Sequence, residues 1–362
     1  MMVVEAAVVE AKENSYAQVL RWPLSCLTPL PLSAMKTLKN LLLLSLLGLS
    51  LVPCAHAQSS AASFPSKPIR IVVGFPAGGP LDQHARLLTD KLQGILGQPI
   101  TVDYKSGAGG IVGAQDVMKS PADGYTLMLA NTGVMVINPG LYSKLPYGTL
   151  KDFVPIARTA MQPLALLVNP SVPAQTLPEF VRYAKANPGK VNYGSAGNGG
   201  ISHLVPEMFK KATGLFMVHI PYRGSAPAFT DLIAGQVQFM AESIPQAAQY
   251  HKQGKVRALA VTSRERNSAL PDVPTVMETQ LASNFDVVGF YGFLAPAGTP
   301  KPIVDKLSDA FKQVLALPDV RNRMISQGAD PAFLGADDFA QFLTAELPKW
   351  NAAVQASGAK LD

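Results

Sequence analysis

Apolar residues along the chain form short β-branched runs that alternate with stretches of helical spacing. Residues 69–73 form an apolar run typical of a buried strand, and the glycine-rich turn 74–80 ends it. The apolar positions that follow recur at the spacing of an amphipathic helix, namely Leu81, Ala85, Leu88, Leu92 and Ile95. The same order of strand, glycine turn and helix is predicted again over residues 99–118.

A second series of strands and helices is predicted over residues 176–262. Because strands alternate with helices in both series, each is expected to build βαβ units around a mainly parallel sheet. Extended segments at 153–168 and 285–295 join the two series. The predicted fold class is therefore α/β, with two lobes, a cleft and two crossing segments. Lobe 1 comprises residues 58–160 and 288–362, and lobe 2 comprises residues 161–287.

Two prolines disturb the predicted helices. Pro206 stands early in the helix that follows Gly200. It either kinks that helix or delays the helix start, so that the proline takes the first helical position. Pro348 is expected to kink or split the last helix, which is predicted over residues 336–356.

The first 57 residues have the pattern of an export signal. A positive segment at 35–39 precedes an apolar run at 41–52, and Ala55-His56-Ala57 is a small-x-small cleavage site. The apolar run is shorter than the ~20 residues that span a bilayer. We therefore predict a signal peptide at 35–57 and an exported mature protein that starts at Gln58. Residues 1–34 are interpreted as a mis-assigned start, with an extended leader as the alternative.

Composition narrows the possible partners. Both cysteines, Cys26 and Cys54, precede the predicted mature start, so the mature chain is expected to have no disulfide and no cysteine metal site. After the first 57 residues the chain has 27 basic and 22 acidic residues and no run of like charge. This pattern does not favour a nucleic-acid partner. The small positive excess suits an acidic small molecule.

Motifs for catalysis are incomplete. In the turn 107–113 the third glycine stands one position too late for a dinucleotide fingerprint, and Ser195 lacks the preceding glycine of a nucleophile elbow. No histidines are paired at metal-binding spacing, and the candidate carboxylates are few, Asp82 and Glu242. We therefore expect no cofactor, no metal and no enzyme activity. The alternative is a secreted hydrolase that uses Ser195, His203 and Asp82.

Glycine- and hydroxyl-rich turns are abundant, and each stands where a helix is predicted to begin. Unpaired backbone N–H groups and the helix dipole make such turns suitable for anions. The turns 74–80 and 195–200 belong to different predicted lobes, so we expect them to face each other across a cleft. This arrangement is typical of a receptor that closes around its ligand by a hinge motion.

In combination these motifs resemble the tripartite tricarboxylate transporter substrate-binding receptors, also called the Bug family. The motifs are FPAGG at 75–79 with Asp82, GAGG at 107–110, DGYTL at 123–127, YGSAGNG at 193–199, HIPYRG at 219–224, LPDVPT at 270–275 and APAGTP at 295–300. The resemblance extends from about Phe64 to the end of the chain.

The resemblance implies a type II periplasmic binding fold, a small carboxylate ligand and the membrane components of a tripartite transporter as partners. A sensor protein is the alternative partner, and we expect a monomer. Most of the ligand-binding residues are carried over from the family, and Asn131 is added because it follows a predicted strand. The set is Phe75, Ala77, Gly78, Gly79, Asp82, Asn131, Ser195, Ala196, Gly197, Asn198, His203, Tyr222, Gly224, Ser225 and Ala226.

Two neighbouring residues of the first loop are interpreted separately. Asp82 is expected to order its loop and cap the following helix, without a chemical role. Leu81 stands where the family usually has a small or hydroxyl residue. It either narrows the mouth of the pocket or packs into the core.

Overall fold

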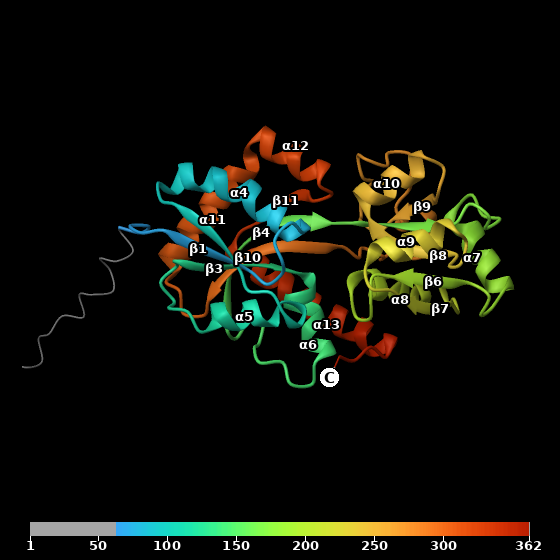
Figure 1. Cartoon of the computed structure of the whole chain (residues 1–362), viewed down its shortest axis with the longest axis horizontal. Helices are drawn as coiled ribbons and strands as arrows, with labels where there is room; N and C mark the ends of the chain where they lie inside the picture. The colour runs from blue at the N-terminus through green and yellow to red at the C-terminus, as the bar shows by residue number, and fades with distance from the viewer. Residues whose placement is uncertain (1–62, 362) are drawn as a thin grey trace, which may run out of the picture. The chain divides into compact units, whose positions relative to one another are not determined.

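The computed structural model describes residues 63–361 (Figure 1), and all of them belong to one compact unit, Ser59–Asp362. The predicted signal peptide at 35–57, the segment 1–34 and the predicted mature start at Gln58 lie outside the described residues.

The first sheet has six strands in the order β11-β4-β10-β3-β1-β2. Its strands are β1 (Ile69–Val73), β2 (Ile100–Tyr104), β3 (Thr126–Asn131), β4 (Phe153–Gln162), β10 (Gly289–Pro296) and β11 (Asp330–Leu334). Strands β1, β2 and β3 are parallel, whereas β10 is antiparallel to both β3 and β4. Strand β10, which comes late in the sequence, therefore lies in the middle of this sheet.

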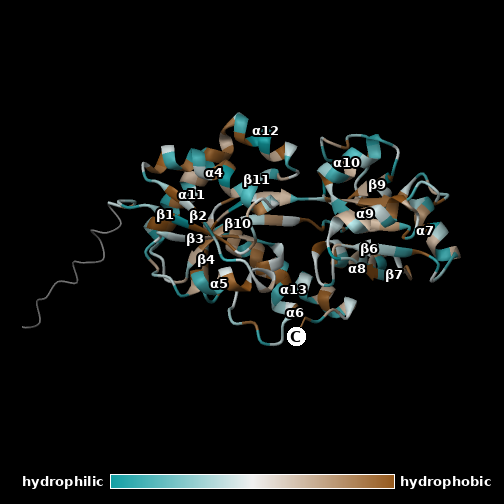
Figure 2. Cartoon of the chain, viewed as in Figure 1, coloured by the Kyte–Doolittle hydropathy of each residue, from teal (hydrophilic) through white to brown (hydrophobic). Residues whose placement is uncertain are grey.

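Helices cover both faces of the first sheet. Helices α4 (Pro80–Leu96), α11 (Lys301–Ala316) and α12 (Pro318–Ser326) contribute to one apolar core. Helices α5 (Ile111–Met118) and α13 (Ala336–Ser357) contribute to the other. Figure 2 shows apolar residues concentrated along the strands and the inward faces of the helices. Both faces of the sheet are thus buried, as is usual where parallel strands are joined by helices.

The second sheet has five strands in the order β7-β6-β8-β5-β9. Its strands are β5 (Leu164–Val168), β6 (Asn192–Ser195), β7 (Val218–Pro221), β8 (Phe239–Ser243) and β9 (Arg257–Val261). The helices around it are α7 (Leu177–Ala186), α8 (Ile201–Thr213), α9 (Ser225–Ile233) and α10 (Ile244–Lys252). The two-sheet α/β architecture predicted from the sequence is confirmed, but the expectation of mainly parallel sheets is wrong. Both sheets are mixed, because β10 and β11 pair antiparallel in the first sheet and β5 pairs antiparallel with β8 and β9 in the second.

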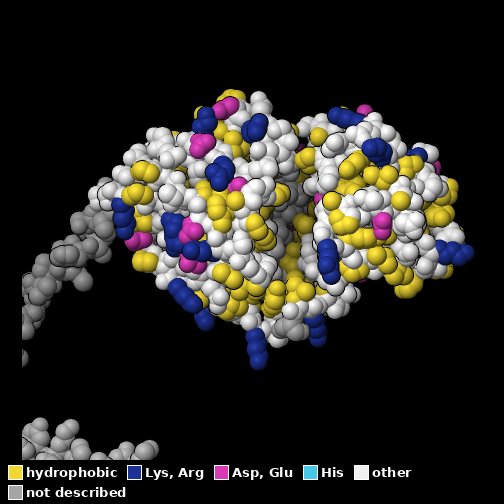
Figure 3. All heavy atoms as spheres, viewed as in Figure 1, with side chains coloured by type: hydrophobic (Ala, Val, Ile, Leu, Met, Phe, Trp, Pro, Cys, Tyr) yellow, Lys and Arg dark blue, Asp and Glu magenta, His cyan; other side chains and the backbone are white. Residues whose placement is uncertain are grey.

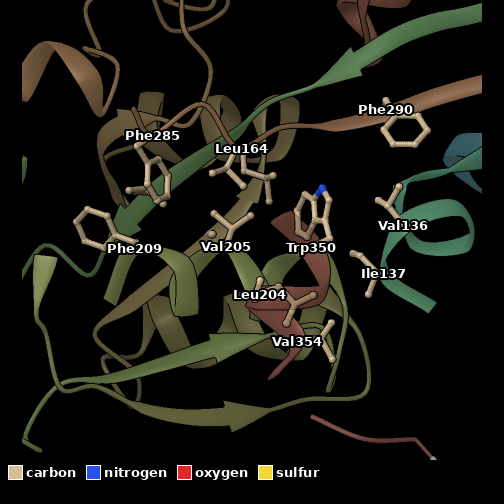
Figure 4. Packing of buried hydrophobic residues seen from close by; sticks show 14 of the residues in the cluster. Val136, Ile137, Leu164, Leu204, Val205, Phe209, Phe285, Phe290, Trp350 and Val354 are labelled. Carbon is tan, nitrogen blue, oxygen red and sulfur yellow. The ribbon is translucent and has the colours of Figure 1, made fainter. Parts of the chain in front are cut away.

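Two chain segments connect the sheets: β4 leads through Pro163 into β5, and the chain returns from β9 to β10. A third connection is made by packing. Helix α13 contacts α8 of the second sheet, and one apolar core includes residues from both sheets. Figure 4 shows Trp350 of α13 between Val136 and Ile137 on one side and Leu204 and Val205 on the other.

The structure differs from the sequence expectations at the prolines and at several short elements. Helix α8 begins at Ile201 and contains Pro206, so the delayed start is wrong. Helix α13 continues through Pro348 without a split. Strand β11 and a π-helical turn at Gly133–Ile137 were not predicted. Among residues 63–361, no helix has both the length and the apolar character that crossing a bilayer requires.

Candidate functional site

A cleft lies where elements of the two sheets meet, and Figure 3 shows it as a groove between the two halves of the molecule. It consists of two adjoining cavities of about 280 and 380 Å³. Both cavities are lined by Gln162 at the end of β4 and by Asn198, Gly200 and Ile201 at the start of α8. The cleft is therefore built from residues of both sheets.

Four helices begin at the larger cavity. Its lining includes Pro80 of α4, Ser202 of α8, Ser225 of α9, and Ser243, which precedes α10. None of these four helices has a side-chain cap at its N-terminus. Because the first N–H groups of a helix have no partner within it, and the helix dipole is positive there, the larger cavity suits an anion.

Charged side chains are scarce in the cleft. Among the described residues that line the two cavities there is no lysine, arginine or histidine, and Glu242 is the single charged residue. An anion bound here would therefore be held by backbone N–H groups and by neutral side chains such as Gln162, Asn198 and Ser225. No group of three histidine, cysteine or carboxylate side chains that suits a metal ion occurs within residues 63–361.

The first loop contributes to the cleft mainly through its ends. Phe75 lines the smaller cavity and Pro80 the larger, whereas the predicted residues Ala77, Gly78 and Gly79 line neither. Ala77 and Gly78 are exposed in this structure.

Asp82 is buried, and its carboxylate fixes this loop by hydrogen bonds. Its Oδ2 accepts the Gly78 N–H at 2.7 Å, and its Oδ1 accepts bonds from Arg86 Nε at 2.7 Å and from the Tyr104 hydroxyl. Burial favours the protonated carboxyl, but the bonds from Tyr104, Gly78 and Arg86 outweigh it and hold the pKa of Asp82 below its usual value. The carboxylate reaches the loop and does not cap the first turn of α4, so the expected cap is wrong.

Leu81 packs into the core beside the first sheet and lines neither cavity. Of the two sequence interpretations, packing is therefore correct.

The second loop is held by its own side chains. Ala196, Gly197 and Asn198 line the cleft, whereas Ser195 is fully buried. The Ala196 N–H donates to Ser202 Oγ at 3.0 Å, and the Gly197 N–H donates to Ser195 Oγ at 3.2 Å. These bonds fix the shape of the loop before any ligand enters. The N–H groups of Ala196 and Gly197, which the sequence suggested for the ligand, are therefore already bonded within the protein.

Two stacked histidines lie behind the second loop. The rings of His203 and His219 are 3.8 Å apart and nearly parallel, and the ring of Tyr193 is stacked at 4.8 Å from that of His219. His203 Nδ1 accepts the Gly199 N–H at 3.1 Å, and His219 Nε2 lies 2.6 Å from Ser195 Oγ. Burial lowers the pKa of His219 to about 4 and lowers that of His203. His203 therefore supports the loop and does not line the cavities.

Some of the remaining predicted residues line the cleft and others do not. Ser225 and Asn131 line the cleft, and Asn131 Oδ1 also accepts the Val134 N–H at 3.1 Å. Tyr222 donates its hydroxyl hydrogen to Asp231 Oδ2 at 2.6 Å. Tyr222, Gly224 and Ala226 line neither cavity. In all, six predicted residues line the cleft: Phe75, Asn131, Ala196, Gly197, Asn198 and Ser225.

Several lining residues were not among the predicted site residues. They are Thr132, Gln162, Ile201, Ser202, Glu242, Ser243, Tyr291 and Gln327, among others. Thr132 and Ser243 stand at the carboxyl ends of strands, where α/β sheets bind ligands, so their position was a usable signal. Gln162 ends β4 and has the same signal. Tyr291 and Gln327 have no such signal, because only the packing of distant segments brings them to the cleft.

The residues of the alternative hydrolase are not assembled for catalysis. Ser195 contacts His219, whereas His203 is bonded to the Gly199 N–H, and Asp82 is bonded to Arg86, Tyr104 and Gly78 in the first loop. Ser195 is also buried away from both cavities. No nucleophile–base–acid series connects these three residues.

Comparison with known proteins gives consistent similarities. Residues 84–359 match the family model described as "Tripartite tricarboxylate transporter family receptor". Protein BugT of Bordetella pertussis is 35% identical over 321 residues, which cover 88% of this chain and 98% of BugT.

Two solved structures show the same similarity. One, R. palustris Rpa4515 with adipate, is 31% identical with a TM-score of 0.70, and the match covers 82% of this chain and all of that one. The other, MatC from Rhodopseudomonas palustris with bound malate, is 34% identical with a TM-score of 0.65, and the match covers 80% of this chain and all of that one.

Proposed function

Because the chain belongs to the tripartite tricarboxylate transporter receptor family, we propose that its cleft captures a small organic carboxylate for delivery to the membrane components of such a transporter. The family is one of receptors and not of enzymes. Its fold is that of the type II periplasmic binding proteins. The adipate and malate in the two similar structures support a carboxylate as the ligand class.

The observation that carries this proposal is the convergence of four uncapped helix N-termini on the larger cavity. A carboxylate placed there accepts N–H bonds from the first turns of the helices and lies at the positive ends of their dipoles. The absence of basic side chains from the described lining makes these backbone groups the main source of attraction.

Capture involves closure of two lobes, which we take as residues 58–160 with 288–362 and residues 161–287. The pivot lies where β4 passes through Pro163 into β5 and where the chain enters β10. Closure brings Pro80 and Phe75 toward Asn198 and Ser225, so that water is excluded and the N–H bonds strengthen. We place the receptor in the periplasm, on the pattern at residues 35–57, and we take it to act as a monomer.

The proposal is tested with the exported protein in calorimetry and thermal unfolding with adipate, malate and succinate. At least one acid is expected to bind and to raise the Tm, because a ligand that binds only the folded state stabilises it. Ala196→Trp fills the larger cavity and is expected to abolish binding. Ala186→Trp, at an exposed site on α7, is the matched control. The proposal fails if no small carboxylate binds to the wild type.

A further inference from the structure

Glu242 is a buried carboxylate at the edge of the larger cavity. It stands near the end of β8, immediately before the residue that precedes α10, and it is 8% exposed. Its Oε1 accepts the Ser243 N–H at 2.7 Å. Its Oε2 is buried and has no hydrogen-bond partner among the described residues. One half of this carboxylate is therefore held in place and the other half lacks a donor.

No basic side chain in the described lining of the cavities is paired with Glu242. No described lysine, arginine or histidine lines either cavity. Buried carboxylates in folded proteins are normally paired or bonded on both oxygens, because an unpaired buried acceptor is costly. A purely structural glutamate at this position would be expected to have such a partner. Because Glu242 lines the cavity, a molecule bound there is placed to supply the missing donor.

The same carboxylate would discriminate among ligands bound in the larger cavity. A second carboxylate of a ligand would be repelled next to Glu242, since like charges in a site with little water disfavour one another. A protonated amine would instead form a charge-assisted hydrogen bond with it, and a hydroxyl would form a weaker one. The anionic end of such a ligand would remain at the helix N-termini of the larger cavity.

We propose that Glu242 recognises a hydrogen-bond donor on the ligand, so that the cleft selects small carboxylic acids that also bear an amine, with a hydroxyl as the second-best group. This inference rests on the proposed function. The helix N-termini hold the carboxylate of the ligand, and Glu242 makes a second contact, with a donor group of the same ligand. Glu242 is then a specificity residue in a site otherwise built from neutral groups.

The test compares acids that differ only in the donor. Calorimetry of the wild-type protein with succinate, malate and aspartate is repeated with glutarate and glutamate, which have a longer chain. Within each series the amine-bearing acid is expected to bind about tenfold or more tightly than the acid without a donor, and malate lies between succinate and aspartate.

The matched variants are Glu242→Gln and Glu265→Gln. Glutamine keeps the shape of Glu242 and an acceptor for the Ser243 N–H, but it removes the charge. Glu242→Gln is expected to reduce the ratio of aspartate to succinate affinity by about tenfold or more. Glu265 is exposed, lies in the same half of the molecule and lines neither cavity, so Glu265→Gln leaves the ratio unchanged.

The outcomes separate the two proposals. If succinate binds the wild type as tightly as aspartate does, or if Glu242→Gln leaves their ratio unchanged, the role of Glu242 is overturned while carboxylate binding stands. If none of the five acids and no adipate binds, carboxylate capture itself fails and the role of Glu242 fails with it. A Glu242→Gln protein that does not fold leaves the wild-type ranking as the deciding measurement.

Discussion

At the scale of single residues, the first loop depends on one carboxylate. Asp82 accepts hydrogen bonds from the loop at Gly78, from α4 at Arg86 and from β2 at Tyr104. These donors come from three parts of the chain, and Arg86 Nη2 also donates to the Tyr104 hydroxyl at 2.7 Å. The position of the loop beside the cleft is therefore fixed by a side chain that does not line either cavity.

Replacement of Asp82 by asparagine is expected to lower the free energy of unfolding by about 1–3 kcal/mol, because a buried acceptor of several donors is weakened. Carboxylate affinity is expected to fall as well, since the loop loses its fixed position. Urea unfolding and calorimetry measure the two effects. Tyr104→Phe removes one donor only and should have a smaller effect, and an Asp82→Asn protein as stable as the wild type would contradict this role.

At the scale of elements, most helices and strands could be predicted because their apolar periods are clear. Strand β11 was missed because Pro331 lies within it and its pairing is with the distant strand β4, which no local pattern reveals. The effect of Pro206 on the start of α8 was misjudged. Because proline has no N–H, the bond from position 206 to the Ser202 carbonyl is missing, and Ser202 lies in the first turn of α8. Packing against the core compensates for that loss.

The candidate site was predicted less completely than the fold. Sequence motifs indicated the loops after β1 and β6, but they do not specify which N–H groups remain free. Ser202 Oγ already accepts the Ala196 N–H, and this bond exists only once α8 has formed. Glu242 was noted as a carboxylate, but its missing partner is a property of the folded cavity.

Burial favours the neutral form of two histidines, His219 on β7 and His84 on α4. Burial lowers the pKa of His219 to about 4, and burial of His84 on α4 lowers its pKa to about 3, from an ordinary value of 6.5. The unfolded chain therefore binds more protons than the folded chain below pH 6.5. Their contribution to stability is fully present above that pH and is lost as the pH falls toward the folded values.

Urea unfolding between pH 7.5 and 4.5 is expected to show stability falling below pH 6.5, by up to about 1.4 kcal/mol per pH unit for each such histidine. His219→Gln does not titrate in this range and should reduce the slope. A stability that stays constant over the whole interval would contradict the neutral, buried state of these rings.

At the scale of the whole molecule, the connection between the two sheets is apolar as well as covalent. The core around Trp350 includes residues packed on both sheets, and Lys349 Nζ donates to the Asp286 carbonyl at 2.7 Å from the same helix. The cleft adjoins this core, because Ile137 and Leu141 belong to the core and also line the smaller cavity. A closing motion is expected to change the packing around α13 while the core of each sheet stays intact.

The location of Trp350 has a practical consequence. The sequence has two tryptophans, and Trp22 precedes the predicted cleavage site, so the exported protein has one. Trp350 is fully buried, and its Nε1–H donates to Glu346 Oε2 at 2.7 Å.

The fluorescence emission of Trp350 is expected to be blue-shifted without ligand. Its intensity is expected to change when a bound acid closes the lobes, in proportion to the fraction of protein that has ligand bound. Trp350→Phe should abolish the signal and keep the affinity measured by calorimetry, whereas an unchanged wild-type spectrum at saturation would contradict movement at this junction. The receptor thus contains its own optical reporter, and ligand screening requires no added label.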